Sequence, residues 1–140
     1  MKGKFFLDTN IFVYSFDVDA PVKKEIATDL VAQSFAEDSG VISYQIIQEF
    51  LNVASRKFKI PLSKNSLSQY LTKFMDPLCK VYPSINLYIE ALDIHDRWRF
   101  SFYDSLVISS ALQAQCEIIY SEDLQHDQVI KNTRIINPFL

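Results

Sequence analysis

The sequence contains few glycines and few cysteines. Gly3 and Gly40 are the only glycines in 140 residues. The phosphate-binding loop GxxxxGK and the dinucleotide motif GxGxxG both need closely spaced glycines, so the sequence excludes both. The two cysteines, Cys79 and Cys116, form no CxxC pair and no other metal-ligand spacing. We expect them to be buried, reduced thiols, as in a cytoplasmic protein.

Long hydrophobic runs and an excess of positive charge are also absent. The apolar stretch near the start ends at Asp8, and no run approaches the roughly 18 residues of a membrane span. We therefore expect a soluble, cytoplasmic protein with no membrane contact. The net charge of −3 argues against holding nucleic acid by bulk charge. The charge does not exclude an enzyme that acts on nucleic acid, because an acidic cluster that takes up a divalent cation becomes locally neutral or positive.

The residues that are present predict alternating strands and helices within one domain, residues 1–140. Hydrophobic residues make up 49% of the chain, which is enough to build a core. Short apolar runs predict strands at 4–7, 41–42, 79–82, 117–120 and 134–136. Helical spacing predicts a short turn at 11–14 and helices from 21, at 44–57, at 67–75, at 84–98 and at 102–115, with Asp76-Pro77 ending the third helix. The order predicts an α/β fold, a central mainly parallel sheet of four to five strands flanked by helices in three layers.

Four acidic residues occupy positions that this topology brings toward one edge. Asp8 follows the first strand and Asp123 follows the fourth, and ligands bind beyond the carboxyl ends of parallel strands. Asp104 opens the mostly apolar helix at 102–115, which should therefore be central, and Glu49 lies on the helix at 44–57. Each has an ordinary alternative: Asp8 and Asp104 suit helix starts, Asp123 suits a turn, and Glu49 suits a solvated helix face.

Taken together, the four acids favour a metal site. Clustered carboxylates repel one another and are tolerated when they bind cations or when some are protonated. Oxygen ligands suit Mg²⁺ or Mn²⁺, and the lack of Cys and His beside these acids argues against zinc. Such a site activates water and stabilises charge on a phosphodiester.

Four segments resemble the motifs of PIN-domain nucleases, in the same order. They are 4–10 (KFFLDTN), 48–50 (QEF), 103–106 (YDSL) and 120–126 (YSEDLQH). Within that family, a chain of this length is most similar to VapC-type toxins, the ribonuclease halves of toxin–antitoxin pairs. One departure is Asp127, which stands where many relatives have Gly after a Leu-Gln-His run. Asp127 is either a surface acid or a fifth carboxylate at the rim of the site.

The resemblance implies a PIN-like fold and a Mg²⁺- or Mn²⁺-dependent endoribonuclease. It also implies a homodimer and inhibition by a small antitoxin protein. It assigns the metal to Asp8, Glu49, Asp104 and Asp123. It assigns supporting roles to Thr9, Asn10 and Ser121.

Positive charge occurs in small groups at 23–24, 56–59 and 97–99, and most of these suit solvated helix ends. We expect Arg97 and Arg99 to contact the RNA backbone, because they lie just before Asp104. A haloacid-dehalogenase-like phosphatase would need a second Asp at position 10, which is Asn. A receiver-like signalling domain would need a well-placed late Lys, and only Lys131 is available. A catalytically idle PIN-like scaffold that binds RNA or protein, and a nuclease acting on DNA, remain as alternatives.

Overall fold

The computed structural model describes residues 3–56, 58 and 62–140. Its elements in chain order are β1 (Phe5–Leu7), α1 (Thr9–Tyr14), α2 (Pro21–Ala36), β2 (Gly40–Ser43), α3 (Tyr44–Ala54), α4 (Lys64–Tyr70), the π-helical segment η1 (Leu71–Met75), α5 (Asp76–Leu78), β3 (Cys79–Val81), α6 (Ile85–Trp98), α7 (Phe102–Gln113), β4 (Ile118–Tyr120), β5 (Val129–Ile130) and β6 (Thr133–Ile136). The predicted α/β fold is confirmed. Among the described residues, no helix is both long enough and apolar enough to cross a membrane.

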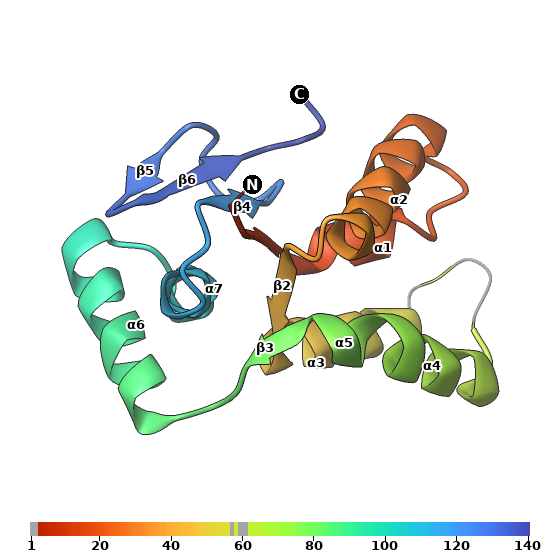
Figure 1. Ribbon diagram of the computed structural model, residues 1–140, viewed down its shortest axis with the longest axis horizontal. Coiled ribbons are helices and arrows are strands. Elements are labelled where there is room, and N and C mark those ends of the chain that lie inside the picture. The colour runs from red at the N-terminus through yellow and green to blue at the C-terminus, as the bar shows by residue number, and fades with distance from the viewer. Residues whose placement is uncertain (1–2, 57, 59–61) are drawn as a thin grey trace.

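The strands form one sheet in the order β3-β2-β1-β4-β6-β5. All pairs are parallel except β5 with β6. The predicted four to five strands become six, because the two-residue β5 was missed. Figure 1 shows α6 and α7 on one side of the sheet, and α1 and α2 on the other.

The direction of strand order reverses at β1. From β1 the chain proceeds to β2 and β3 on one side, and later to β4 and β6 on the other. Such a reversal leaves a crevice beyond the carboxyl ends of the strands, because the connections leave in opposite directions. Asp8 stands at this point, and its backbone N–H donates to the Tyr120 carbonyl oxygen at 3.0 Å.

The central helix is α7, as its apolar composition predicted. Residues 105–111 are all buried, including three serines. Two of these serine hydroxyls donate to carbonyls one turn earlier in the helix, Ser105 to Ser101 and Ser110 to Leu106, which satisfies them without an outside partner. A helix buried on all sides fixes Asp104, in its first turn, against the rest of the fold.

Two helix predictions need correction. The predicted stop at Asp76-Pro77 is wrong, since helical backbone continues through η1 into α5. Pro77 lies in the first turn of α5, where a missing N–H leaves no helical bond unmade, and the wider π-helical turn precedes it. In α2 the buried residues include Leu30 and Val31, whereas Val22 in the first turn is 71% exposed. The predicted 44–57 helix ends at Ala54, and residue 57 lies outside the described residues.

Candidate metal and phosphodiester site

The four predicted acids line one pocket of about 270 Å³ at the carboxyl edge of the sheet. We call it the acidic pocket. It is lined by Asp8, Thr9, Asn10, Gln45, Glu49, Asn52, Val53, Tyr103, Asp104, Val107 and Asp123. The strand order explains the convergence: Asp8 follows β1, Asp123 follows β4, Glu49 lies on the helix after β2, and α7 brings Asp104.

Asp8 is the most buried of the four acids, at 8% exposure. The Thr9 backbone N–H donates to its Oδ1 at 2.8 Å, and the Ser121 hydroxyl donates to its Oδ2 at 2.7 Å. Burial raises the pKa of Asp8 to about 6; these two donors oppose the rise, and the charges of Glu49 and Asp123 add to it. Asp8 also caps α1 through Thr9, so the capping role expected from the sequence is present as well.

Two further acids are held by the residues that follow Asp8. The Thr9 hydroxyl donates to Glu49 Oε1 at 2.6 Å, and Asn10 Nδ2 donates to Asp123 Oδ2 at 2.9 Å. The start of α1 therefore connects three of the four carboxylates. Thr9, Asn10 and Ser121, assigned supporting roles by the resemblance, each donate to one acid, while their role toward a metal stays a prediction.

Asp104 is positioned by its backbone. Its N–H donates to the hydroxyl of Ser101, the N-cap of α7, at 3.1 Å, which is one half of the expected capping box. Its half-buried side chain lines the acidic pocket. Among the residues that the structure describes, no hydrogen bond to its carboxylate is found, which leaves this group available to a ligand.

A three-residue clamp holds the segment that carries Asp123. The preceding residue, Glu122, accepts from the Tyr14 hydroxyl and from Lys23 Nζ, both at 2.6 Å. The Lys23 ammonium also lies 4.7 Å from the centre of the Tyr14 ring. Lys23 is thus engaged within the protein, and the pKa of Glu122 is lowered by these two donors in spite of partial burial.

The basic residues noted in the sequence lie outside the acidic pocket or outside the described residues. Arg97 and Arg99 are exposed at the end of α6 and do not line the acidic pocket; Arg97 stacks on Trp98 with 4.7 Å to the ring centre. Their contact with RNA stays a prediction. Of the basic group at 56–59, Lys57 and Lys59 lie outside the described residues.

Asp127 is a surface acid in the structure. It does not line the acidic pocket, and its carboxylate lies 3.4 Å from Arg134. Its φ of 68° is in the left-handed region, which favours glycine and which Asp tolerates better than most residues. Asp127 therefore adopts a backbone conformation that glycine also adopts readily.

Gln45 and Tyr103 also line the acidic pocket, and sequence reasoning did not single out either. Gln45 Nε2 donates to the Tyr103 carbonyl oxygen at 3.2 Å, which ties α3 to the start of α7. A signal was available for both: Gln45 lies one turn before Glu49 on the same helix, and Tyr103 precedes Asp104.

The acidic pocket has the donor set of a hard divalent cation, since every charged group in it is a carboxylate. As the side chains stand, no group of three or more His, Cys, Asp and Glu within the described ranges is close enough together to hold a metal ion. The chemistry of the residues fits Mg²⁺ or Mn²⁺. A coordination group is therefore not preformed in this conformation.

The protein is thus an α/β protein whose acidic pocket lies where the order of the strands reverses. The sequence matches the PIN domain family over residues 5–132, and the chain belongs to that family. None of the curated proteins compared with the chain matches it.

Several solved structures share the fold. A toxin–antitoxin complex from Klebsiella pneumoniae has a TM-score of 0.64 and 13% identity, over 96% of this chain and 98% of that chain. VapC20 of Mycobacterium tuberculosis, a toxin that cleaves the sarcin–ricin loop, has a TM-score of 0.61 and 13% identity, over 86% of this chain and 90% of its own. At this identity the likeness establishes the fold.

Proposed function

We propose that this chain is a Mg²⁺- or Mn²⁺-dependent endoribonuclease that hydrolyses RNA phosphodiesters in the cytoplasm. The observation that carries the proposal is the convergence of Asp8, Glu49, Asp104 and Asp123, from four separate segments, on one pocket. Membership of the PIN domain family supports it.

The four carboxylates would hold the metal, which when bound supplies a water of lowered pKa and stabilises negative charge on the phosphate. The chain's own contribution is to fix the acids. Ser121 and the Thr9 N–H keep Asp8 oriented, and the Thr9 hydroxyl and Asn10 restrain Glu49 and Asp123. Asp104, whose side chain is less constrained, completes the set.

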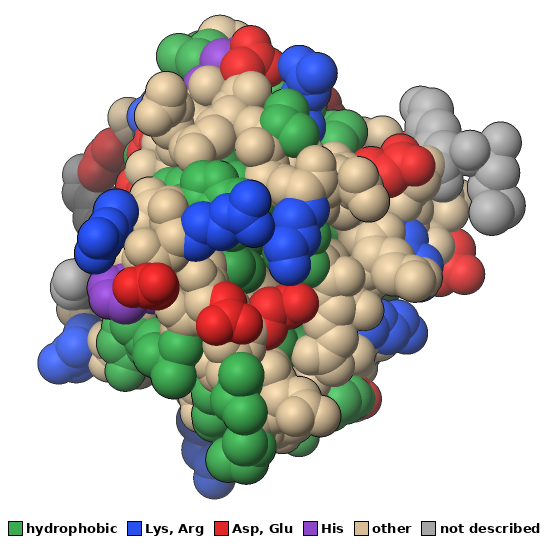
Figure 2. Space-filling model, turned by 90° about the vertical axis from the view of Figure 1, so that its left-hand side faces the viewer, with side chains coloured by type: hydrophobic (Ala, Val, Ile, Leu, Met, Phe, Trp, Pro, Cys, Tyr) green, Lys and Arg blue, Asp and Glu red, His purple; other side chains and the backbone are tan. Residues whose placement is uncertain are grey.

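We further propose that the chain is the toxin of a toxin–antitoxin pair. The fold likeness to a toxin–antitoxin complex and to a toxin supports this assignment. Such a protein would bind an antitoxin protein and form a homodimer. We assign a protein contact to the outer face of α6, where Ile85, Ile89 and Leu92 are 72%, 52% and 54% exposed. Figure 2 shows hydrophobic side chains gathered low on the side of the molecule that carries α6, and such patches mark interaction surfaces.

The experiment that tests the nuclease proposal is incubation of the purified chain with total cellular RNA. Mg²⁺ or Mn²⁺ is supplied with and without chelator, and Asp104→Asn is run in parallel. The matched control is Glu25→Gln, which neutralises an exposed acid of α2 that does not line the acidic pocket. We expect discrete products from wild type and Glu25→Gln, and none with chelator or with Asp104→Asn.

The second candidate is an idle PIN-like scaffold that binds RNA or protein. The absence of a preformed metal group among the described residues is the observation that favours it. Absence of cleavage in every metal, together with no heat of metal binding in calorimetry, would establish the scaffold instead. Equal cleavage of ribose and deoxyribose oligonucleotides would extend the substrate to DNA.

A further inference from the structure

A second cavity, of about 310 Å³, adjoins the acidic pocket at the same edge of the sheet. Four tyrosines line it, Tyr44, Tyr82, Tyr88 and Tyr103, so we call it the tyrosine pocket. It lies beyond the carboxyl ends of β2 and β3, and β2 is the neighbour of β1, the strand that Asp8 follows. Gln45 and Tyr103 line both cavities, so the two share a wall.

The inner wall of the tyrosine pocket carries two oxygens without partners. Ser43 Oγ and Gln45 Oε1 are buried and have no hydrogen-bond partner among the described residues. The side chains of Ser43 and Gln45 are only 3% and 9% exposed. A buried polar atom without a partner is unfavourable, and each such atom calls for an explanation.

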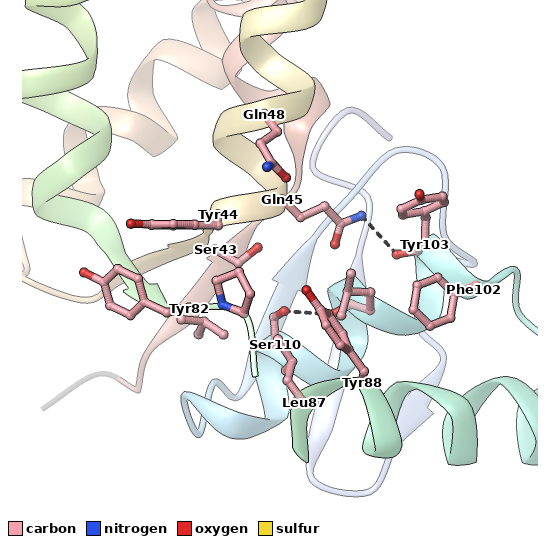
Figure 3. A pocket seen from close by; sticks show the side chains of 13 residues that line it. Ser43, Tyr44, Gln45, Gln48, Tyr82, Leu87, Tyr88, Phe102, Tyr103 and Ser110 are labelled. Carbon is pink, nitrogen blue, oxygen red and sulfur yellow. Dashed lines mark hydrogen bonds between the residues drawn. The ribbon is translucent and has the colours of Figure 1, made fainter. Parts of the chain in front are cut away.

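Local structure fixes both oxygens where they are. Ser43 is the N-cap of α3, but its hydroxyl makes no capping bond, although serine at this position ordinarily does so. The Gln45 amide is oriented by its Nε2, which must face the Tyr103 carbonyl because a carbonyl only accepts. Its Oε1 is therefore directed away from that carbonyl. Figure 3 shows Ser43 and Gln45 between Tyr44 and Tyr82 on one side and Tyr88 and Phe102 on the other, with the free oxygens toward the space between.

The rims of the cavity are aromatic and open to solvent. Tyr44 and Tyr82 are 44% and 51% exposed and pack edge to face, with ring centres 4.9 Å apart. Tyr103 is 65% exposed on the wall shared with the acidic pocket. Exposed aromatic rings beside a polar floor suit a flat ring that stacks on them and hydrogen-bonds at its edge.

We propose that the tyrosine pocket binds one base of the RNA substrate, next to the phosphodiester held in the acidic pocket. The inference rests on the proposed ribonuclease function, whose substrate it specifies. Gln45 Oε1 only accepts, while the Ser43 hydroxyl both accepts and donates, so the pair favours a base whose exocyclic amino group can donate to both oxygens, as in adenine, cytosine and guanine. Uracil has no amino group, and the one donor on its pairing edge, N3–H, can reach only one of the two oxygens.

The test compares Ser43→Ala and Gln45→Leu with Ser110→Ala. Ser110 lines the same cavity, but its hydroxyl already donates to the Leu106 carbonyl at 2.7 Å, so it is the matched control. Ser43→Ala removes an atom that has no partner, so we expect this variant to stay folded. Binding of the four nucleoside 5′-monophosphates is measured by NMR without divalent metal, and cleavage is measured on a randomised oligoribonucleotide pool with Mn²⁺.

We expect wild type and Ser110→Ala to bind AMP, CMP and GMP about 5- to 10-fold more tightly than UMP, the effect of one or two hydrogen bonds. The same discrimination against uracil is expected at one position beside the cleavage site. Ser43→Ala and Gln45→Leu should each reduce both preferences several-fold.

The two arms separate failure of this inference from failure of the proposed function. Base-selective binding without cleavage would support the pocket and overturn the nuclease. Cleavage with the same base preference in wild type, Ser43→Ala and Gln45→Leu would overturn the pocket and leave the nuclease standing. A homodimer that Tyr82→Asp dissociates, with no nucleotide binding by either form, would assign the cavity to a second copy of the chain and also overturn the inference.

Discussion

The acidic pocket and the tyrosine pocket adjoin, but they differ in whether their polar atoms have hydrogen-bond partners. In the acidic pocket three of the four carboxylates accept hydrogen bonds from neighbouring side chains. In the tyrosine pocket Ser43 and Gln45 keep oxygens without partners. Carboxylates held in place suit a ligand whose shape does not vary, such as a metal with a phosphate. Hydrogen-bonding atoms without partners suit a ligand whose identity the site distinguishes by hydrogen bonds, such as one base among four.

The largest expected effect on stability comes from neutralising Asp8. Its pKa rises from 3.8 to about 6 on folding, so its favourable contribution is fully present below about pH 3.8 and is lost as pH rises through 6. At neutral pH the ionised group lowers stability by up to about 3 kcal/mol. Asp8→Asn keeps an acceptor for the Thr9 N–H, so without divalent metal it should be about 2–3 kcal/mol more stable than wild type at pH 7.5.

Urea unfolding of both proteins from pH 3.5 to pH 8 measures this difference. The gain should shrink to near zero at the acidic end of the range. We expect the same variant to lose RNA cleavage, so stability and activity move in opposite directions. Equal stability of the two proteins at pH 7.5 would contradict the burial argument for Asp8.

Divalent metal should cancel that difference in stability. If the four carboxylates hold Mn²⁺, a concentration of about 100 times Kd stabilises wild type by about 2.7 kcal/mol. Thermal unfolding with increasing Mn²⁺ should raise the Tm of wild type and leave the Tm of Asp8→Asn nearly unchanged. A parallel rise in both would place the metal elsewhere.

A pair of serine substitutions compares the two pockets directly. Ser121 and Ser43 are both buried, but only the Ser121 hydroxyl has a partner, Asp8. Ser121→Ala leaves a buried carboxylate oxygen bare and should destabilise the protein by about 1–3 kcal/mol, while Ser43→Ala should change stability by less than about 0.5 kcal/mol. Denaturant midpoints of the two variants check this, and similar losses in both would remove the contrast.

The smallest effect is expected at Asp127, outside both pockets. Glycine relieves the left-handed backbone at φ 68°, but it gives up the contact with Arg134 and increases the entropy of the unfolded chain. Asp127→Gly should therefore stay within about 1 kcal/mol of wild type and cleave RNA at the same rate. A large fall in cleavage would restore Asp127 as a fifth acid at the rim of the site.

The sequence predicted the elements whose signal is contiguous. The runs at Phe5–Leu7 and Ile118–Tyr120 are strands, and the acids that follow such runs meet at one edge because parallel strands end together. Strand β5 has two residues and no pattern to detect. The helix continues past Pro77 because proline is tolerated in a first helical turn, which local sequence does not reveal.

The tyrosine pocket was missed for a different reason. Its four tyrosines come from α3, from the chain after β3, from α6 and from α7, and no sequence spacing relates them. The rule that located Asp8 applies nevertheless. Ser43 ends β2 and Tyr82 follows β3, and side chains at the carboxyl ends of neighbouring parallel strands meet.

The two outer strands of the sheet limit how another polypeptide can associate with this protein. β3 has three residues with exposed Lys80 at its centre, and β5 has only two. Neither edge strand offers enough free backbone for a peptide to pair with it as a further strand. A lysine on an edge strand also disfavours such strand addition. The same feature protects the folded chain from edge-to-edge aggregation, and it favours recognition of the proposed toxin through side-chain surfaces such as the outer face of α6.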